Sequence, residues 1–212
     1  MSFEPSTGFR PPQQARSRAA LQKLLLAAEE SLAAVGLDDF TIADVSERAG
    51  VSVGAIYRRF DSKEELLAAV KDRLLTRVET TITEALAGSE PGLVNVIDSF
   101  ARGLAESFSL GDQVIPDLLS SSSVELHERG LRTLSSLQRL FMNAIAPYLG
   151  EVRRGDPMTS AESTAHTLIG ACVHRAASVR RWPDGLSWEL WADHISSMAV
   201  GYLLTSDTRG TE

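Results

Sequence analysis

Apolar residues recur along most of this chain at steps of three and four positions, which places them on one face of an α-helix. A first stripe predicts a helix that Gly36 ends, because glycine adopts the left-handed conformation of a helix terminus at little cost. Its members are Leu21, Leu24, Leu25, Ala28, Leu32 and Val35. We expect this helix to cover two shorter ones that follow it.

Two short apolar stripes come next, separated by a glycine. Ile42, Val45 and Ala49 form the first, and Val53, Ile56 and Phe60 are expected to face inward from the second. Thr41 with Asp44, and Ser52 before the second stripe, are typical N-terminal caps. Gly50 suits a left-handed turn, after which Val51 should enter the core. Two short helices around such a turn indicate a helix-turn-helix.

A long helix is predicted to begin after Ser62, whose hydroxyl can form a capping box with Glu65. Its apolar stripe runs from Leu67 to Leu86, and Gly88 ends it. At 1.5 Å per residue, about 25 residues span roughly 38 Å, enough to connect two domains mechanically.

Helical periods continue over residues 93–108, 124–149, 159–182 and 187–204, with Thr159 and Glu162 as a capping box after Pro157. Strand-like alternation does not compete with them. The sequence therefore predicts an all-α fold, with an N-terminal helix-turn-helix domain and a C-terminal helical domain.

The outward side of the second short helix carries Gly54, Tyr57 and Arg58, followed by Arg59. Arginine binds guanine or phosphate, and tyrosine commonly donates to phosphate. Glycine inside a helix costs roughly 1 kcal/mol relative to alanine, but it allows a backbone to come close. The alternative interpretation is that Tyr57 packs sideways and the arginines are solvated surface residues.

Composition agrees with an ordinary globular protein: 43% of the 212 residues are hydrophobic and 23% are charged. We expect a cytoplasmic location, because the sequence contains neither a membrane-spanning stretch nor an apolar signal core. Cys172 is the single cysteine and excludes a disulfide within the chain. The four histidines have no metal-like pairing, so neither a metal nor a cofactor is expected.

The net charge of −7 is unevenly divided. Residues 1–75 carry ten Lys/Arg and eleven Asp/Glu, a balance of −1, whereas residues 76–212 carry eleven and seventeen, a balance of −6. DNA binding requires a locally basic surface rather than a basic protein. No acidic residue lies between Pro5 and Ala28, whereas this stretch contains Arg10, Arg16, Arg18 and Lys23. The chain therefore enters its first helix as a basic arm. The alternative is that residues 1–12 are a disordered leader that is merely soluble.

The helix-turn-helix block resembles the N-terminal domain of the tetracycline-repressor (TetR) family of bacterial transcription regulators. The matching residues are Thr41, Ile42, Val45, Ser46, Ala49, Gly50, Val51, Ser52, Gly54, Ile56, Tyr57, Phe60, Lys63 and Leu66. Ser46 replaces the family's usual alanine, and Arg59 stands where histidine is common. The resemblance covers roughly residues 15–75, about a third of the chain.

The resemblance implies a division into a flexible basic arm (1–14), a DNA-binding domain (15–61), a connecting helix (62–88) and an effector-binding and dimerisation domain (89–212). We expect DNA contacts from Arg16, Arg18, Thr41, Ser52, Val53, Gly54, Tyr57, Arg58, Arg59 and Lys63. Lys63 and the amides at the start of the connecting helix would together form a phosphate clamp.

In the family the last two long helices usually form a four-helix dimer interface. Here the expected interface residues are Leu168, Cys172, Ala176, Val179, Trp191, Ile195, Met198 and Tyr202; the alternative is that these stripes are only intrachain core. By the same resemblance, six large apolar residues would line a ligand pocket: Phe100, Leu104, Phe108, Leu137, Phe141 and Trp182.

The leading hypothesis is a homodimeric repressor that binds a palindromic operator in double-stranded DNA and is released by a small-molecule effector. A second possibility keeps DNA binding but gives the C-terminal domain no effector. A third, a small helical enzyme or carrier, lacks a glycine-rich nucleotide loop, a G-x-S-x-G elbow and an H-E-x-x-H motif. We therefore expect no enzymatic activity.

Overall fold

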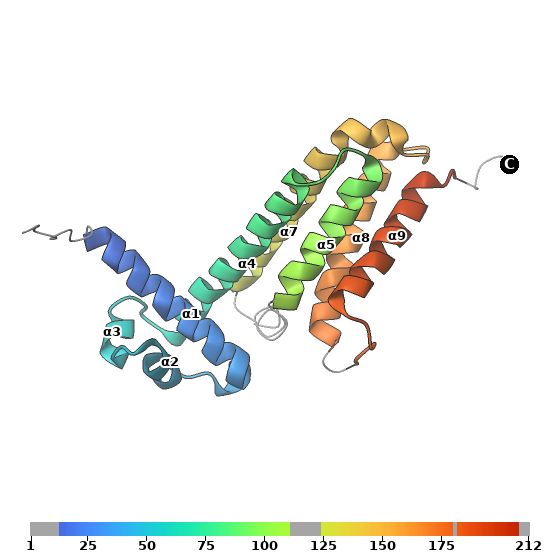
Figure 1. Ribbon diagram of the computed structural model, residues 1–212. Coiled ribbons are helices and arrows are strands. Elements are labelled where there is room, and N and C mark those ends of the chain that lie inside the picture. The colour runs from blue at the N-terminus through green and yellow to red at the C-terminus, as the bar shows by residue number, and fades with distance from the viewer. Residues whose placement is uncertain (1–12, 111–123, 180–181, 208–212) are drawn as a thin grey trace, which may run out of the picture. The chain divides into compact units, whose positions relative to one another are not determined.

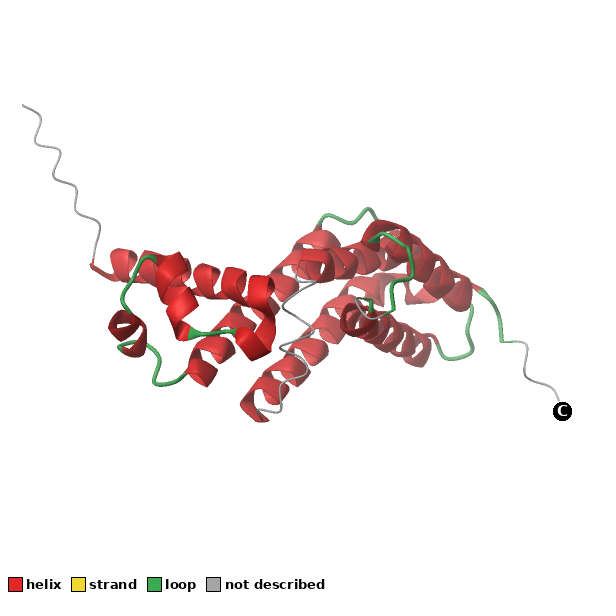
Figure 2. Cartoon of the chain, turned by 90° about the horizontal axis from the view of Figure 1, so that it is seen from below, coloured by secondary structure: helices red, strands yellow, loops and turns green. Residues whose placement is uncertain are grey.

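The computed structural model describes residues 13–110, 124–179 and 182–207, and all regular elements in these ranges are helices (Figure 2). This confirms the predicted all-α fold. The chain divides into two compact units, Met1–Val70 and Lys71–Glu212. None of the helices in the described ranges has both the length and the apolar character that a membrane crossing requires.

The first unit contains α1 (Gln13–Asp39), α2 (Ile42–Ala49), α3 (Val53–Tyr57) and the first two turns of α4 (Lys63–Ala87) (Figure 1). Gly36 interrupts α1 with a left-handed φ of 77°, as its position in the sequence predicts. Most of the predicted inward stripe of α1 is buried or partly buried, but Val35 beside this break is 38% exposed. The unit's core is formed by Leu24, Ala28, Leu32, Phe40, Val45, Ile56, Phe60 and Leu66.

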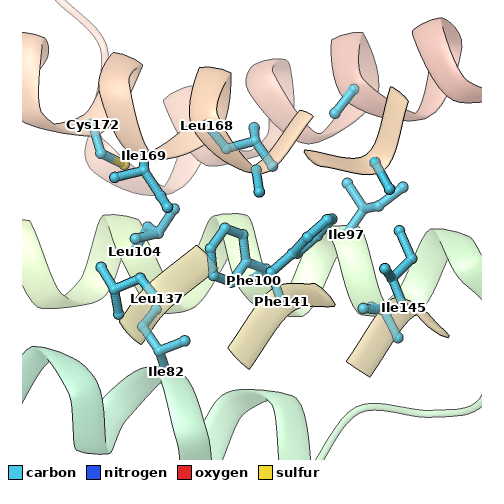
Figure 3. Packing of buried hydrophobic residues seen from close by; sticks show 14 of the residues in the cluster. Ile82, Ile97, Phe100, Leu104, Leu137, Phe141, Ile145, Leu168, Ile169 and Cys172 are labelled. Atoms are coloured by element: carbon cyan, nitrogen blue, oxygen red, sulfur yellow. The ribbon is translucent and has the colours of Figure 1, made fainter. Parts of the chain in front are cut away.

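The second unit packs the rest of α4 with α5 (Leu93–Leu110), α7 (Val124–Ile145), a 3₁₀ turn η1 (Ala146–Glu151), α8 (Pro157–Ser178) and α9 (Trp188–Leu204). Helix α5 is central, since it contacts α7, α8 and α9. Its buried face meets large apolar side chains from the neighbouring helices, and the rings of Phe100 and Phe141 lie 4.7 Å apart between centroids (Figure 3). These helices hold one continuous hydrophobic core.

A proline displaces two of the predicted helix boundaries in this unit. Helix α8 begins at Pro157, and its cap is Asp156, whose carboxylate accepts from the Thr159 backbone N–H at 3.0 Å. The missing N–H of proline costs nothing at the first helical position, so the helix starts two residues earlier than the Thr159 capping box predicted. Helix α7 ends at Ile145 and continues only as the 3₁₀ turn that contains Pro147.

A buried arginine ties the end of α8 to the start of α9. Arg175, 5% exposed, donates to both carboxylate oxygens of Asp184 at 3.0 Å and to the Leu186 carbonyl at 2.8 Å. Its guanidinium lies 4.3 Å from the ring centroid of Trp188 and 5.3 Å from that of Trp191. The hydrogen bonds from Arg175 lower the pKa of Asp184, because they favour the ionised carboxylate.

Candidate nucleic-acid interface

The two short helices of the first unit start at the caps that the sequence predicts. The Thr41 hydroxyl accepts from the Asp44 backbone N–H at 3.1 Å and donates to the Asp44 carboxylate at 2.8 Å. The Ser52 hydroxyl accepts from the Ala55 backbone N–H at 3.2 Å. Each cap satisfies an amide that the helix itself leaves unpaired, and so fixes where α2 and α3 begin.

The turn between the helices is closed by backbone geometry and by one hydroxyl. Gly50 has a left-handed φ of 63°, and its N–H donates to the Glu47 carbonyl at 3.1 Å. The Ser46 hydroxyl donates to the Val51 carbonyl at 2.5 Å, while the Val51 N–H donates to the Ser46 carbonyl at 3.1 Å. Serine in place of the usual alanine therefore adds a hydrogen bond across the turn and leaves the fold intact.

The outward side of α3 carries the side chains that the sequence analysis assigned to DNA. Tyr57 is 48% exposed, and Arg58 and Arg59 are also exposed. Helix α3 ends at Tyr57 with Arg58 as its C-cap, so Arg59 lies just beyond the helix. The surface thus offers one hydroxyl and two guanidinium groups beside a short exposed helix.

Two valines predicted to face inward are instead on this surface. Val51 is 37% exposed and Val53 is 40% exposed, whereas Ile56 is fully buried and Phe60 nearly so. A helix of five residues turns only one side chain fully inward, so the core is closed by Ile56 and by Phe60 from the turn that follows. Val53 consequently extends the exposed face at the start of α3.

Gly54 occupies the middle of that face. A Cβ atom added to it would meet no atom within 4 Å, so packing inside the chain does not require a glycine here. Glycine weakens a helix, so this position lowers the helix propensity of α3 without a packing benefit inside the chain.

The basic residues before α2 are only partly described. Arg18 is exposed, and the nearby Ser17 hydroxyl accepts a hydrogen bond of 3.4 Å from Arg59. This contact brings the start of α1 next to the residue after α3. The side chain of Arg16 and most of the expected arm (residues 1–12) lie outside the described part of the chain.

At the start of α4 the predicted capping box forms, but the Lys63 ammonium is less free than expected. The Ser62 hydroxyl accepts from the Glu65 N–H at 3.1 Å, and the Glu65 carboxylate accepts from the Asp61 N–H at 2.5 Å. Lys63 is partly buried, with its Nζ atom 5.6 Å from the ring centroid of Phe40. A phosphate clamp would thus have to draw Lys63 away from this ring.

The six expected pocket residues separate into two groups. Phe100, Leu104, Phe108, Leu137 and Phe141 are buried together in the core of the second unit (Figure 3). Trp182 does not join them, because it is 70% exposed in the connection between α8 and α9. The apolar period predicted a helix up to residue 182, but α8 ends at Ser178, and Trp182 lies beyond it.

The expected interface residues also lie on two sides of their helices. Leu168, Cys172 and Ala176 point from α8 into the intrachain core, and burial raises the pKa of the Cys172 thiol (Figure 3). Met198 and Tyr202 are exposed on α9 at 74% and 40%, while Val179, Trp191 and Ile195 are half-buried. Only part of the predicted stripe is thus available to a partner.

A groove of about 450 Å³ runs between the outer faces of α8 and α9. Four expected interface residues line it: Leu168, Ile195, Met198 and Tyr202. The small residue Ala171 lies beside them, together with four residues that the sequence did not single out: Ser163, Thr164, Thr167 and Ala199. A second hollow, of about 270 Å³, lies between α5 and α9 and was not predicted; Arg102, Glu106, Trp188 and Glu189 are on its rim. Neither the groove nor the hollow is marked by a sequence motif, so neither could be predicted from the sequence.

Comparison with known proteins agrees with this geometry. Residues 24–70 match the family described as bacterial regulatory proteins, tetR family. The HTH-type transcriptional regulator BetI of Serratia proteamaculans is 23% identical over 203 residues, which cover 93% of this chain and 98% of that protein. The uncharacterised HTH-type regulator YvdT of Bacillus subtilis is 38% identical over 69 residues, 32% of this chain and 36% of that protein.

Solved structures share the fold along most of the chain. A putative TetR-family regulator from Rhodococcus sp. superposes with a TM-score of 0.68 at 21% identity, covering 88% of this chain and 100% of that one. The regulator FadR from Bacillus subtilis, solved in complex with stearoyl-CoA, gives a TM-score of 0.68 at 16% identity, covering 86% and 98%.

The helix-turn-helix geometry of the first unit, the family match over it and the shared helical fold of the second unit lead to one assignment. Residues 24–70 carry the DNA-binding domain of the TetR family, and the chain is similar to HTH-type transcriptional regulators along most of its length.

Proposed function

We propose that this protein is a cytoplasmic repressor that binds a palindromic operator as a homodimer and is released by a small-molecule effector. The observation that carries the proposal is the exposed face of α3, where Gly54 offers an open approach between Tyr57 and Arg58. A short helix of this kind enters the major groove, where arginine reads guanine bidentately. The backbone phosphates would be held by the hydroxyls of Thr41 and Ser52 and by Arg16, Arg18, Arg59 and Lys63. Val53, at the start of α3, would contact the DNA through its apolar side chain.

A second copy of the chain is the proposed occupant of the groove between α8 and α9. Met198, 74% exposed, is a large apolar side chain in a groove that Leu168 and Ile195 line together with small and hydroxyl-bearing residues. Such residues let helices approach closely, and a two-fold axis would place the same groove on both partners. Two recognition helices related by this axis would reach successive major grooves about 34 Å apart.

The proposed release mechanism is a shift in population between two arrangements of α4. An effector bound in the second unit would favour a spacing of the recognition helices that does not fit successive grooves. The solved complex of the neighbour FadR with stearoyl-CoA supports an effector, because a regulator of this fold binds a ligand in that complex.

One observation favours the second candidate, a DNA-binding dimer without an effector. The five buried residues expected to line a pocket are packed against each other, with the Phe100 and Phe141 rings 4.7 Å apart between centroids. A thermal-shift screen of hydrophobic and cationic metabolites separates the two candidates. A true effector raises the unfolding midpoint by mass action and weakens DNA binding, whereas the second candidate predicts that no compound does both.

DNA binding itself is tested by titrating the purified protein against duplex DNA at moderate salt. The proposal predicts retention of particular sequences over random ones, with a dimer bound per site. Equal affinity for all duplexes would remove it, because phosphate contacts alone account for such binding.

A further inference from the structure

Arg129 of α7 is a charged side chain held largely out of solvent against α4. Its side chain is 18% exposed, and its Nε atom donates to the Asp72 carboxylate at 2.6 Å. Its Nη1 atom donates to the Glu79 carboxylate at 3.0 Å, and its Nη2 atom to the Thr76 hydroxyl at 3.2 Å. One guanidinium thus holds three side chains of the neighbouring helix.

Thr133, one turn further along α7, completes the arrangement. Its hydroxyl is in hydrogen-bond contact with Nη1 of Arg129 and donates to the Glu79 carboxylate at 2.8 Å. Thr133 is 3% exposed, so this part of the cluster is dry. The hydroxyl accepts from Arg129 and donates to Glu79, which fixes both partners of the ion pair.

The three partners on α4 follow each other at steps of four and three, and so lie on one face over two helical turns. Sliding or tilting α4 relative to α7 would break several charge-assisted hydrogen bonds at once. It would also leave the Arg129 guanidinium unpaired in a place that water reaches poorly. Glu79, 28% exposed, should matter more than Asp72, which at 63% exposed is well screened.

The same helix carries the DNA-binding unit. Helix α4 begins at Lys63, directly after the helix-turn-helix, and Asp72 lies two positions beyond the boundary at Val70. An α-helix is stiff over this length. A shift of α4 along α7 would therefore also move the first turns of α4, which belong to the DNA-binding unit.

We infer that Arg129 is a positioning residue for operator binding, which locks α4 against α7 in the register that the DNA-binding state requires. The inference rests on the proposed function and names the contact through which that function is regulated. Any effector that releases DNA by moving α4 must break this cluster.

The test uses the full chain and a duplex that the wild-type protein selects from a random-sequence library. Arg129→Ala should weaken binding to that duplex about tenfold, and Glu79→Gln should reproduce most of the loss. The double variant should be no weaker than Arg129→Ala, because both changes break one interaction. Asp72→Asn should change affinity less than twofold. The dependence of affinity on salt should keep its slope in all of them, since no phosphate contact is removed.

A matched control lies on the same helix. Arg132 and Glu128 form an exposed ion pair of 3.7 Å within α7, with side chains 65% and 64% exposed. Arg132→Ala removes the same charge without touching α4, and should bind the duplex as the wild type does. Circular dichroism at the binding temperature verifies that each variant is folded. If Arg129→Ala is not, Arg129→Lys keeps the charge but not the fork of donors, and should give an intermediate loss.

The outcomes are distinct. Wild-type affinity in folded Arg129→Ala, even with a lower unfolding temperature, would make Arg129 merely structural and overturn the inference alone. Losses that add up in the double variant would overturn it as well. A wild-type protein that selects no duplex would overturn the proposed function, and the inference with it.

Discussion

At the scale of single residues, the proposed DNA-facing surface combines exposed side chains with a glycine that internal packing does not require. Tyr57 and Arg58 are exposed, and the position between Val53 and Ala55 carries a glycine that nothing in the chain requires. Residues whose conformation or exposure costs stability without an internal benefit are expected where a protein meets its partner.

Replacing that glycine should separate stability from function. Gly54→Ala should raise the free energy of unfolding by roughly 0.5–1 kcal/mol, because alanine is the better helix former and its Cβ meets no atom within 4 Å. The same Cβ should hinder DNA and weaken specific binding. Gly130→Ala in α7, where the added Cβ is equally free of contacts, is the control that should gain stability and keep affinity. Undiminished affinity in Gly54→Ala would show that DNA does not approach here.

Arg58 should contribute sequence preference. Arg58→Ala is expected to cost about 1–3 kcal/mol of specific binding and to relax the choice of base at one operator position. A binding-site selection with the variant measures this. A uniform loss over all sequences, with a salt slope lower by about one, would instead assign Arg58 to a phosphate.

At the scale of elements, periodicity and capping residues were sufficient wherever helices are long or sharply capped. Helix α4 begins after Ser62 and ends at Ala87 as predicted, and Thr41, Gly50 and Ser52 take the expected roles. The inward face of the five-residue helix α3 was harder to predict. An apolar stripe needs several helical turns, and α3 is too short to provide them. Pro157 precedes the Thr159 capping box that the sequence predicts, yet it occupies the first position of α8.

Helix α8 shows why a candidate interface cannot be derived fully from sequence. Leu168, Cys172 and Ala176 form one line of small and apolar residues, while Ser163, Thr167 and Ala171 form another. Both lines suit close helix packing, so the sequence does not distinguish the core side from the outer side. Only the position of α5 resolves this, since it covers the first line.

The corner between α8 and α9 should respond to acid. The folded-state pKa of Asp184 lies below its ordinary value because Arg175 and the Leu186 amide bind the ionised form. Its contribution to stability is therefore complete above the unfolded pKa of about 3.9 and is lost as pH falls below it through the folded pKa. Urea unfolding at pH 6 and in steps below pH 4 measures this. Asp184→Asn should unfold more easily at pH 6 and lose less stability on acidification; an unchanged pH dependence would contradict the ion pair.

At the scale of the whole molecule, the acidic second unit and the DNA-binding first unit are two parts of one regulator, joined by a helix that belongs to both. The proposed dimer supplies the two-fold symmetry that a palindromic operator needs. A substitution in the groove between α8 and α9 should therefore disrupt the dimer.

Met198→Glu should convert the dimer into monomers, because it adds a charge to the apolar groove that the partner would cover. Sedimentation velocity at several concentrations checks this. Met158→Glu is the control, since Met158 is 49% exposed at the start of α8 and does not line the groove. Equal dimer fractions in both variants would place the interface elsewhere.

The central claim is that the exposed face of α3 reads a palindromic operator. The most direct measurement is selection of duplexes from a random-sequence library by the wild-type protein, followed by titration of the selected duplex and a scrambled one at moderate salt. We predict an inverted repeat with half-sites about one helical turn apart, bound at least about 1,000-fold more tightly than the scrambled duplex. Enrichment of no sequence, or equal affinity for the two duplexes, would contradict the account.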